Sequence, residues 1–251
     1  MKVLVVNPYW YPWNTAGTFR WLNFSEYIDF DVLTSIRPNK GFKDETIKNT
    51  NKRCYRFGYK LPACISGLLL AFVSCFIRAD AYVFSSPPET LLFGAWFNEK
   101  ILKRKVLVDM RDSINRDSQR LKLLIPVYRF FYDRLENVVV CWQFLDPSKE
   151  VVYHGYDEIE RSKGAHKKAV YDYYKAPQNI YRMFLSYGLI SDFSHKPKGY
   201  GSSSFPTIRK LGYDVNQKLH DECYTFELVS WKESALKMKK IIDRLGRKQH
   251  G

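Results

Sequence analysis

Three charged residues, Asp109, Arg111 and Asp112, follow the apolar run 106–108. An apolar run of strand length that ends in charged side chains is typical of a parallel sheet, in which ligands bind at the carboxyl ends of the strands. A carboxylate there can take the proton from a reacting hydroxyl group, and an arginine can hold a phosphate through two parallel hydrogen bonds. The alternative is structural: Asp109 caps the next helix, while Arg111 and Asp112 pair at the surface.

A second candidate cluster, Gly17, Thr18 and Arg20, stands at the predicted start of a helix, for which Thr18 is a candidate N-cap. This helix would follow an apolar strand at 2–7 and an aromatic loop at 8–18. The N–H groups and the positive dipole end of a helix N-terminus suit an anion such as phosphate. The sequence has no G-x-G-x-x-G pattern, so a dinucleotide fingerprint is absent.

The aromatic loop also carries Trp10, Tyr11 and Trp13, whose rings either contact a substrate or pack on the core of the protein. Ser85 and Ser86 stand at another predicted junction between a strand and a helix. Two prolines follow them, and proline suits the first turn of a helix. We expect these five side chains to contact a substrate.

The positions of these residues depend on apolar segments of strand length that alternate with segments of helix length. We expect strands at 2–7, 30–36, 54–59, 81–84, 106–109 and 138–140, and helices from 18 onward and at 61–77, 91–102 and 121–135. Such alternation predicts an α/β fold with a parallel, doubly wound domain over residues 1–146. Residues 147–251, which include a predicted closing helix at 231–245, fit a second, smaller α/β domain.

Residues 61–77 carry no charged side chain. A membrane-spanning helix needs roughly 20 apolar residues, and this segment is interrupted by Pro62, Ser66, Gly67 and Ser74. We therefore expect a buried helix that connects two strands. The alternative is a helix with one face against a membrane.

The charge balance points to an anionic partner. The 251 residues have a formal net charge of +14, with 45% hydrophobic and 26% charged residues, which is typical of a globular protein. Such an excess favours nucleic acid, an acidic membrane face or a phosphorylated substrate. The five cysteines are odd in number and form no C-x-x-C pair, so we expect reduced thiols in a cytoplasmic protein and no zinc site.

Three motifs resemble those of GT-B glycosyltransferases: Ser-Ser-Pro-Pro at 85–88, Asp-Met-Arg-Asp at 109–112 and Phe-Pro-Thr-Ile-Arg at 205–209. The first two look like motifs of transferases that build bacterial surface glycans. The last two are similar to segments of phage enzymes that glucosylate DNA. The resemblance implies an α/β, GT-B-like fold with two Rossmann-like domains: an N-terminal acceptor domain at 1–146 and a shortened C-terminal nucleotide-sugar-binding domain at 147–251.

The second half of the chain departs from this pattern. It is shorter than in such enzymes, and Gly212 stands where a glutamate is expected three residues after the donor-binding Arg209. The paired glutamates of many retaining relatives are also absent from it.

The resemblance implies transfer of a sugar from a nucleotide sugar, with a UDP-sugar as the expected donor, onto a hydroxylated pyrimidine such as 5-hydroxymethylcytosine in double-stranded phage DNA. Asp109 would be the catalytic base, with Asp112 as the competing choice, and Arg111 would orient the carboxylate or bind phosphate. The expected donor-binding residues are Gly17, Thr18, Arg20, Ser202, Ser203, Ser204, Arg209 and Lys210. The expected acceptor-binding residues are Trp10, Tyr11, Trp13, Ser85 and Ser86, with the aromatic rings stacking on a flipped base or filling its gap.

No dedicated metal site is visible, although the donor could bring a divalent metal ion. Two alternatives remain open. One is a surface-glycan transferase with a lipid-linked acceptor at the cytoplasmic face of an acidic membrane. The other is a non-catalytic nucleic-acid-binding protein on a transferase scaffold. The transferase interpretation as a whole depends on the carboxylate of Asp109 lying at the mouth of a cleft and facing a cationic residue, Arg209, of the second domain.

Overall fold

The structure, a computed structural model, describes residues 1–37, 42–43, 52–111, 114, 122–141, 145–146, 148–153 and 230–247. The chain divides into two units, Met1–Tyr153 with Lys232–Gly251, and His154–Trp231. Of the second unit, only Ser230 and Trp231 are among the described residues.

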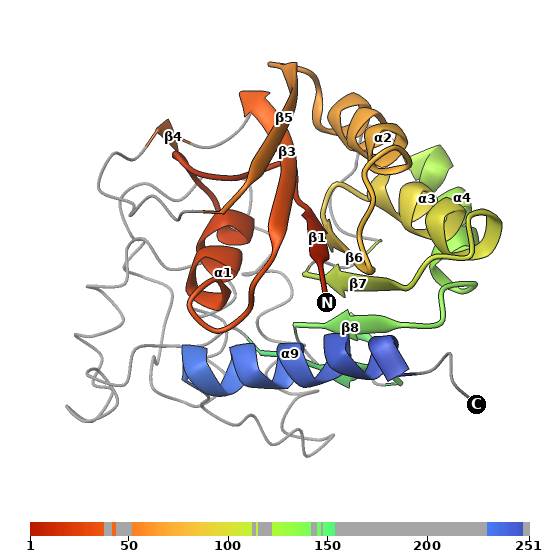
Figure 1. Ribbon diagram of the computed structural model, residues 1–251. Helices are drawn as coiled ribbons and strands as arrows, with labels where there is room; N and C mark the ends of the chain where they lie inside the picture. Colours follow the sequence, from red (N-terminus) through yellow and green to blue (C-terminus); the bar gives the residue numbers. More distant parts are fainter. Residues whose placement is uncertain are drawn as a thin grey trace, which may run out of the picture. The chain divides into compact units, whose positions relative to one another are not determined.

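A seven-stranded sheet forms the centre of the first unit (Figure 1). Its strands in spatial order are β5 (Cys54–Tyr59), β3 (Asp31–Arg37), β1 (Val3–Val6), β6 (Ala81–Ser86), β7 (Val106–Met110), β8 (Val138–Val140) and β9 (Glu150–Val151). Every neighbouring pair is parallel. The central strands are buried on both faces, which is why they appear in the sequence as continuous apolar runs. Two short strands, β2 (Trp13–Asn14) and β4 (Phe42–Lys43), pair antiparallel outside this sheet.

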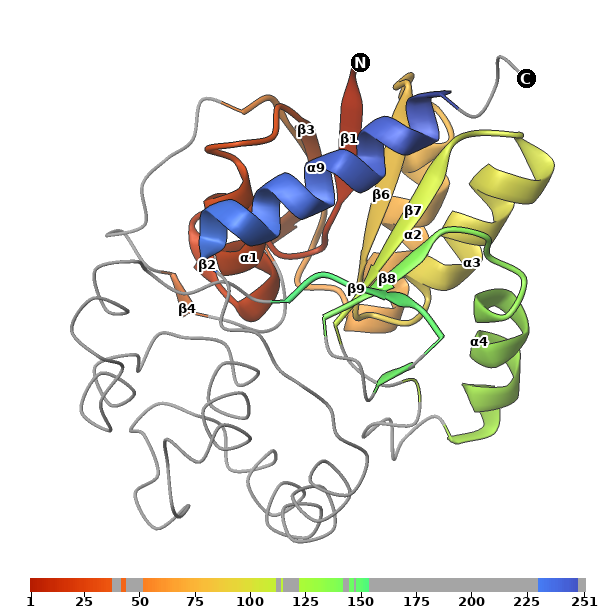
Figure 2. The same cartoon turned by 90° about the horizontal axis from the view of Figure 1, so that it is seen from below.

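Helices cover both faces of the sheet (Figures 1 and 2). On one face lie α1 (Ala16–Phe24) and α9 (Trp231–Arg247), and on the other lie α2 (Ala63–Ser74), α3 (Leu91–Trp96) and α4 (Ile125–Tyr132). A π-helical turn, η1 (Phe97–Ile101), extends α3, and a 3-10 turn, η2 (Lys122–Leu124), precedes α4. This arrangement is the parallel, doubly wound α/β fold predicted from the alternation of strands and helices, and it is compatible with a Rossmann-like fold.

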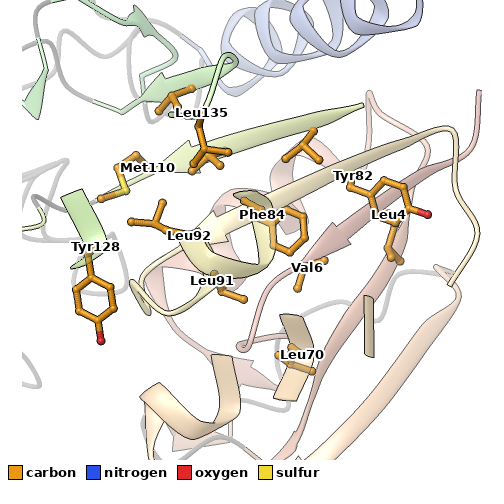
Figure 3. Close-up of a cluster of buried hydrophobic side chains, with 14 of the residues drawn as sticks. Leu4, Val6, Leu70, Tyr82, Phe84, Leu91, Leu92, Met110, Tyr128 and Leu135 are labelled. Atoms are coloured by element: carbon orange, nitrogen blue, oxygen red, sulfur yellow. The ribbon is translucent and has the colours of Figure 1, made fainter. Parts of the chain in front are cut away.

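The main hydrophobic core lies between the sheet and the layer of α2, α3 and α4 (Figure 3). Alternate strand residues point to opposite faces, so Leu4 and Val6 of β1 belong to this core. The helices of this layer pack closely: a Cβ atom added at Gly94 of α3 would lie 2.3 Å from the Cβ of Ala71 in α2. A larger residue at Gly94 would therefore force the two helices apart.

The closing helix α9 belongs to the first unit and not to the second, with which the sequence grouped it. Its buried side chains recur at helical spacing and form one apolar stripe, which consists of Trp231, Ala235, Met238, Ile241, Ile242 and Leu245. Lys105 Nζ donates to the carbonyl of Gly246, and Arg244 pairs with Glu150 of β9. Strand β9 likewise extends the first sheet, although it falls after the predicted boundary at residue 146.

Helix α2 lies where the sequence predicts a helix between two strands, but only its inner face is buried. Its outer face exposes apolar side chains, which include Leu68 and Phe72. Within the part of the chain that the structure describes, no helix has the length and apolar character needed to cross a bilayer.

Candidate functional site

The candidate site lies at the carboxyl ends of the central strands. Strand β1 has β3 on one side and β6 on the other, so the chain leaves β1 in one direction and later returns to its opposite side. Loops that follow such neighbouring strands diverge and leave a crevice, which is where open α/β sheets bind ligands. The predicted residues on the loops after β1, β6 and β7 therefore meet at the same edge of the sheet.

Asp109 is held in a buried ion pair with Arg20 of α1. Arg20 Nε donates to Asp109 Oδ2 and Arg20 Nη2 donates to Asp109 Oδ1, each at 3.1 Å. Both side chains are 0% exposed. The hydroxyl of Ser85 also donates to Asp109 Oδ2, at 3.3 Å, and accepts a hydrogen bond from Trp21 Nε1 at 3.0 Å. A two-point contact of this kind is the stronger form of ion pair and satisfies both buried charges.

Arg20 also donates hydrogen bonds to the backbone of residues 152–153, which follow β9. Its Nη1 donates to the carbonyl of Tyr153 at 3.0 Å, and its Nη2 donates to the carbonyl of Val152 at 2.8 Å. Ser234 of α9 donates to the same Tyr153 carbonyl. The Asp109–Arg20 pair thus ties α1, β7, the segment after β9 and α9 together.

This geometry differs from the predicted roles of both residues. The carboxylate of Asp109 is enclosed, and both of its oxygens accept hydrogen bonds from protein groups, so it does not lie at the mouth of a cleft. Arg20 is fully buried and pairs with the carboxylate of Asp109, so its charge is balanced within the protein and is not presented to a donor phosphate. The structure gives the pair a structural function. Ser85, predicted to contact the acceptor, is also fully buried within this network.

Arg111 and Gly17, which the sequence places in the catalytic and donor-binding sets, lie close together at the edge of the sheet. Arg111 Nε donates to the carbonyl of Ser86 at 3.2 Å, and its Nη2 donates to the carbonyl of Pro87 at 3.4 Å. A Cβ atom added at Gly17 would lie 2.5 Å from Arg111 Nη1. Only glycine lets the start of α1 approach the guanidinium so closely.

The first turn of α1 is capped by Thr15 instead of the predicted Thr18. Thr15 Oγ1 accepts a hydrogen bond from the backbone N–H of Thr18 at 3.2 Å, and the two hydroxyl oxygens are 3.0 Å apart. The helix begins at Ala16, before the predicted start, because Thr15 supplies the cap. Thr18 itself is buried, so its side chain supports the helix start.

The aromatic loop is largely packed into the protein. Trp10 is buried and meets the ring of Phe30 edge to face at 6.0 Å between centroids. Its faces are therefore not open to a stacked base, as the predicted acceptor role requires. Tyr11 and Trp13 are half-buried, and the Tyr11 carbonyl accepts a hydrogen bond from Arg56 at 2.8 Å.

Two residues at this edge were not singled out from the sequence, Tyr9 after β1 and Glu89 after β6. Burial raises the pKa of the Tyr9 hydroxyl, the nearby charge of Arg111 lowers it in part, and Glu89 raises it further. These electrostatic effects place Tyr9 near both Arg111 and Glu89. Tyr9 and Glu89 each follow the end of a strand by a few residues, and this position is the sequence signal that could have identified them.

Several predicted site residues lie outside the described residues: Asp112, Ser202, Ser203, Ser204, Arg209 and Lys210. Among the described residues, no three His, Cys, Asp or Glu side chains come close enough together to hold a metal ion. The buried hydroxyl of Ser86 and the side-chain amide nitrogen of Asn7 find no hydrogen-bond partner within the described ranges. Both residues stand at the carboxyl ends of neighbouring strands, Asn7 directly after β1 and Ser86 at the end of β6.

Comparison with known proteins does not identify the chain: no protein-family model matches it, and no curated protein matches it.

Proposed function

We propose that this protein is a glycosyltransferase that uses a nucleotide sugar, with a UDP-sugar as the first candidate, as its donor. The observation that carries the proposal is the contact of the Arg111 guanidinium with Gly17 at the first turn of α1, at the point where the strand order reverses. A guanidinium beside the N–H groups of a helix start suits the diphosphate of such a donor. The motif resemblance supplies the reaction class.

Arg111 suits this task because its own contacts fix its position. Hydrogen bonds to the carbonyls of Ser86 and Pro87 orient the guanidinium before a ligand arrives. The side chain is 4% exposed, so its charge acts through a medium less polar than water. During transfer, a charge held in this way would offset the negative charge that builds on the departing diphosphate.

We assign the proton-accepting role to Asp112, the competing choice from the sequence, because Asp109 is committed to Arg20. A base must reach the hydroxyl that it deprotonates, and a fully enclosed carboxylate cannot. Attack of the deprotonated hydroxyl oxygen on the sugar's anomeric carbon would break the bond to the diphosphate and invert the configuration. Asp109 would then be a positioning residue for the edge of the sheet.

For the acceptor, the first candidate is a hydroxylated pyrimidine such as 5-hydroxymethylcytosine in DNA. The net charge of +14 suits the DNA backbone, and the resemblance at 109–111 and 205–209 supports this reading. The burial of Trp10 removes one of the three rings expected to contact the base.

The second candidate acceptor is a lipid-linked glycan at an anionic membrane face. The specific observation that favours it is the exposed apolar face of α2, which a DNA-modifying enzyme does not require. We regard this acceptor as the one that the described structure supports better.

The test is incubation of the full chain with a panel of nucleotide sugars and three acceptors: 5-hydroxymethylcytosine DNA, unmodified DNA and a polyprenyl-phosphate-linked sugar. Mass spectrometry of nucleosides and lipids detects transfer, and release of nucleoside diphosphate detects hydrolysis. We expect transfer from at least one donor. Loss of activity in Arg111→Ala, with activity retained in the charge-matched control Lys237→Ala on the exposed face of α9, would support the assigned site.

If the chain binds DNA but neither transfers nor hydrolyses any nucleotide sugar, the proposal fails. The alternative of a non-catalytic nucleic-acid-binding protein would then hold. A strong decrease in DNA affinity with rising salt would identify that binding as contact with phosphates.

A further inference from the structure

The outer face of α2 carries a continuous apolar stripe that the sheet does not use. Ile65, Leu68, Phe72 and Phe76 are spaced by three or four residues, so they project from the same side of the helix and the turn that follows it. Phe72 is 64% exposed and Phe76 is 72% exposed. Their rings contact each other edge to face at 5.0 Å between centroids.

The opposite side of α2 makes the packing contacts that hold the helix against the rest of the protein. Residues of that side, among them Leu70 and Ala71, are buried against the sheet and α3. The exposed stripe is therefore an addition to the core contact of the helix and not a substitute for it. A group of exposed apolar side chains of this kind marks a surface that binds a membrane, a ligand or another protein.

Helix α4, on the same side of the sheet (Figure 1), also exposes apolar side chains. Leu123, at 92% exposure, precedes it, and Val127 and Phe130 are also exposed. The ring of Phe130 lies under the guanidinium of Arg134, at 3.6 Å from the ring centre.

The charged residues that flank the α2 stripe most closely in the sequence are positive. Residues 61–77 carry no charge, and this uncharged segment is bounded by Lys60 on one side and Arg78 on the other, both exposed. The first acid after the stripe, Asp80, accepts a hydrogen bond from the backbone nitrogen of Lys2 at 2.6 Å. Apolar and aromatic side chains bounded by lysine and arginine match the acyl chains and anionic headgroups of a bilayer surface.

We propose that this stripe (Ile65, Leu68, Phe72 and Phe76) with its flanking Lys60 and Arg78 docks the protein on an anionic lipid bilayer. The helix lies on the membrane surface: it is too short to span a bilayer, since its 12 residues extend about 18 Å. Phenylalanine and leucine side chains enter the boundary between headgroups and acyl chains, while the basic residues contact the headgroups. The inference stands on this surface alone and does not rest on the proposed sugar transfer.

The test is co-sedimentation of the full chain with vesicles, in the absence of any nucleotide sugar. One set of vesicles contains phosphatidylcholine with phosphatidylglycerol, and the other contains phosphatidylcholine only. We expect the protein to pellet with the anionic vesicles at physiological salt. The double variant Phe72→Ser and Phe76→Ser should bind at least about tenfold more weakly, because two large apolar side chains no longer leave water. Leu236→Ser, an exposed apolar position of α9 on the other side of the sheet, should bind as the wild type does.

A second pair of variants separates this site from the general positive charge of the chain. One double variant is Lys60→Glu with Arg78→Glu, and its control is Lys237→Glu with Lys239→Glu. Both replace two cations by two carboxylates, so they change the net charge equally, and all four side chains are exposed. We expect the first variant to lose most of its vesicle binding and the second to keep most of it.

Three results would overturn the proposal. The first is a wild-type chain that stays in the supernatant with anionic vesicles. The second is equal binding by the serine double variant and the wild type, which would leave charge alone as the cause. The third is a dimer that forms without lipid and is lost in the serine variant, since the stripe would then bind a second copy. These results would remove the observation that favours the lipid-linked acceptor, but they do not bear on sugar transfer itself, which the donor panel measures separately.

Discussion

Charged side chains are usually exposed to water and large apolar ones are usually buried. The carboxyl edge of the sheet and the outer face of α2 depart from this distribution in opposite ways. At the edge, charged side chains are buried: Asp109 and Arg20 are removed from water. On α2, apolar side chains are exposed, with Phe72 as an example. A buried charge is tolerated only when it is paired, and an exposed apolar surface is costly unless something covers it. The charges of the first region are therefore balanced within the chain, whereas the apolar side chains of the second region need a binding partner to remove them from water.

The largest effect should follow from breaking the buried pair. Arg20→Ala leaves the Asp109 carboxylate buried without its cation, so we expect the free energy of unfolding to fall by about 3 to 5 kcal/mol. Urea-induced unfolding of the full chain measures this change. The double variant Arg20→Met with Asp109→Leu removes both charges and should lose less stability than the single variant. A loss under about 1 kcal/mol in Arg20→Ala would show that the pair is not enclosed as described.

The contact between Gly17 and Arg111 should be the next most sensitive feature. Gly17→Ala places a methyl group where the guanidinium lies, so Arg111 must move. We expect a loss of about 1 to 3 kcal/mol in stability and at least about tenfold weaker binding of UDP, measured by calorimetry.

A matched control for Gly17 is Gly246→Ala in α9. The nearest atom to its added Cβ would be the flexible Met1 Sδ, at 3.3 Å. Alanine also favours a helix over glycine, so this variant should be as stable as the wild type or more so. Equal UDP binding by Gly17→Ala and the wild type would argue against the proposed donor site.

The two faces of α2 should respond differently to substitution. Phe72→Ser with Phe76→Ser changes exposed positions, so the free energy of unfolding should change by less than about 1 kcal/mol. Leu70→Ala on the buried face of the same helix should cost about 2 to 5 kcal/mol. Thermal unfolding of both variants tests the contrast. If the serine variant is as destabilised as Leu70→Ala, the stripe is part of the core and not a docking surface.

The smallest effect concerns Glu99, a buried carboxylate that pairs with Lys100 at 3.1 Å. Burial raises the pKa of Glu99 above its usual 4.5, and the hydrogen bond and charge of Lys100 lower it only in part. The folded state therefore holds this proton more tightly than the unfolded state does. Stability from this group is present below pH 4.5 and is lost as the pH rises through the folded pKa.

Glu99→Gln should remove this contribution, so its stability should decrease less than that of the wild type as the pH rises from about 4 to 7. Urea-induced unfolding at several pH values measures the difference. Identical pH profiles for the two proteins would indicate that Lys100 cancels the effect of burial.

Much of the fold could be predicted from local patterns. The runs Val3–Val6 and Val138–Val140 are continuous and apolar because both faces of these strands are covered. Arg111 and Gly17 could be placed at one edge because each follows a strand end, and parallel strands share their carboxyl edge. The helix start was harder to place, because Thr15 and Thr18 are both good caps and only the backbone geometry distinguishes them.

The sequence by itself determined the parallel α/β sheet and the edge at which polar residues gather, because strand burial and strand direction follow from periodicity and connection length. Only the tertiary structure decided that Asp109 would be enclosed by Arg20, that α9 would return to the first sheet and that one apolar face of α2 would remain in water. Asp109 and Arg20 are 89 positions apart in the chain, and no local pattern specifies which of several arginines will pair with a given carboxylate. That choice follows from packing, which brings distant residues together and leaves other surfaces exposed.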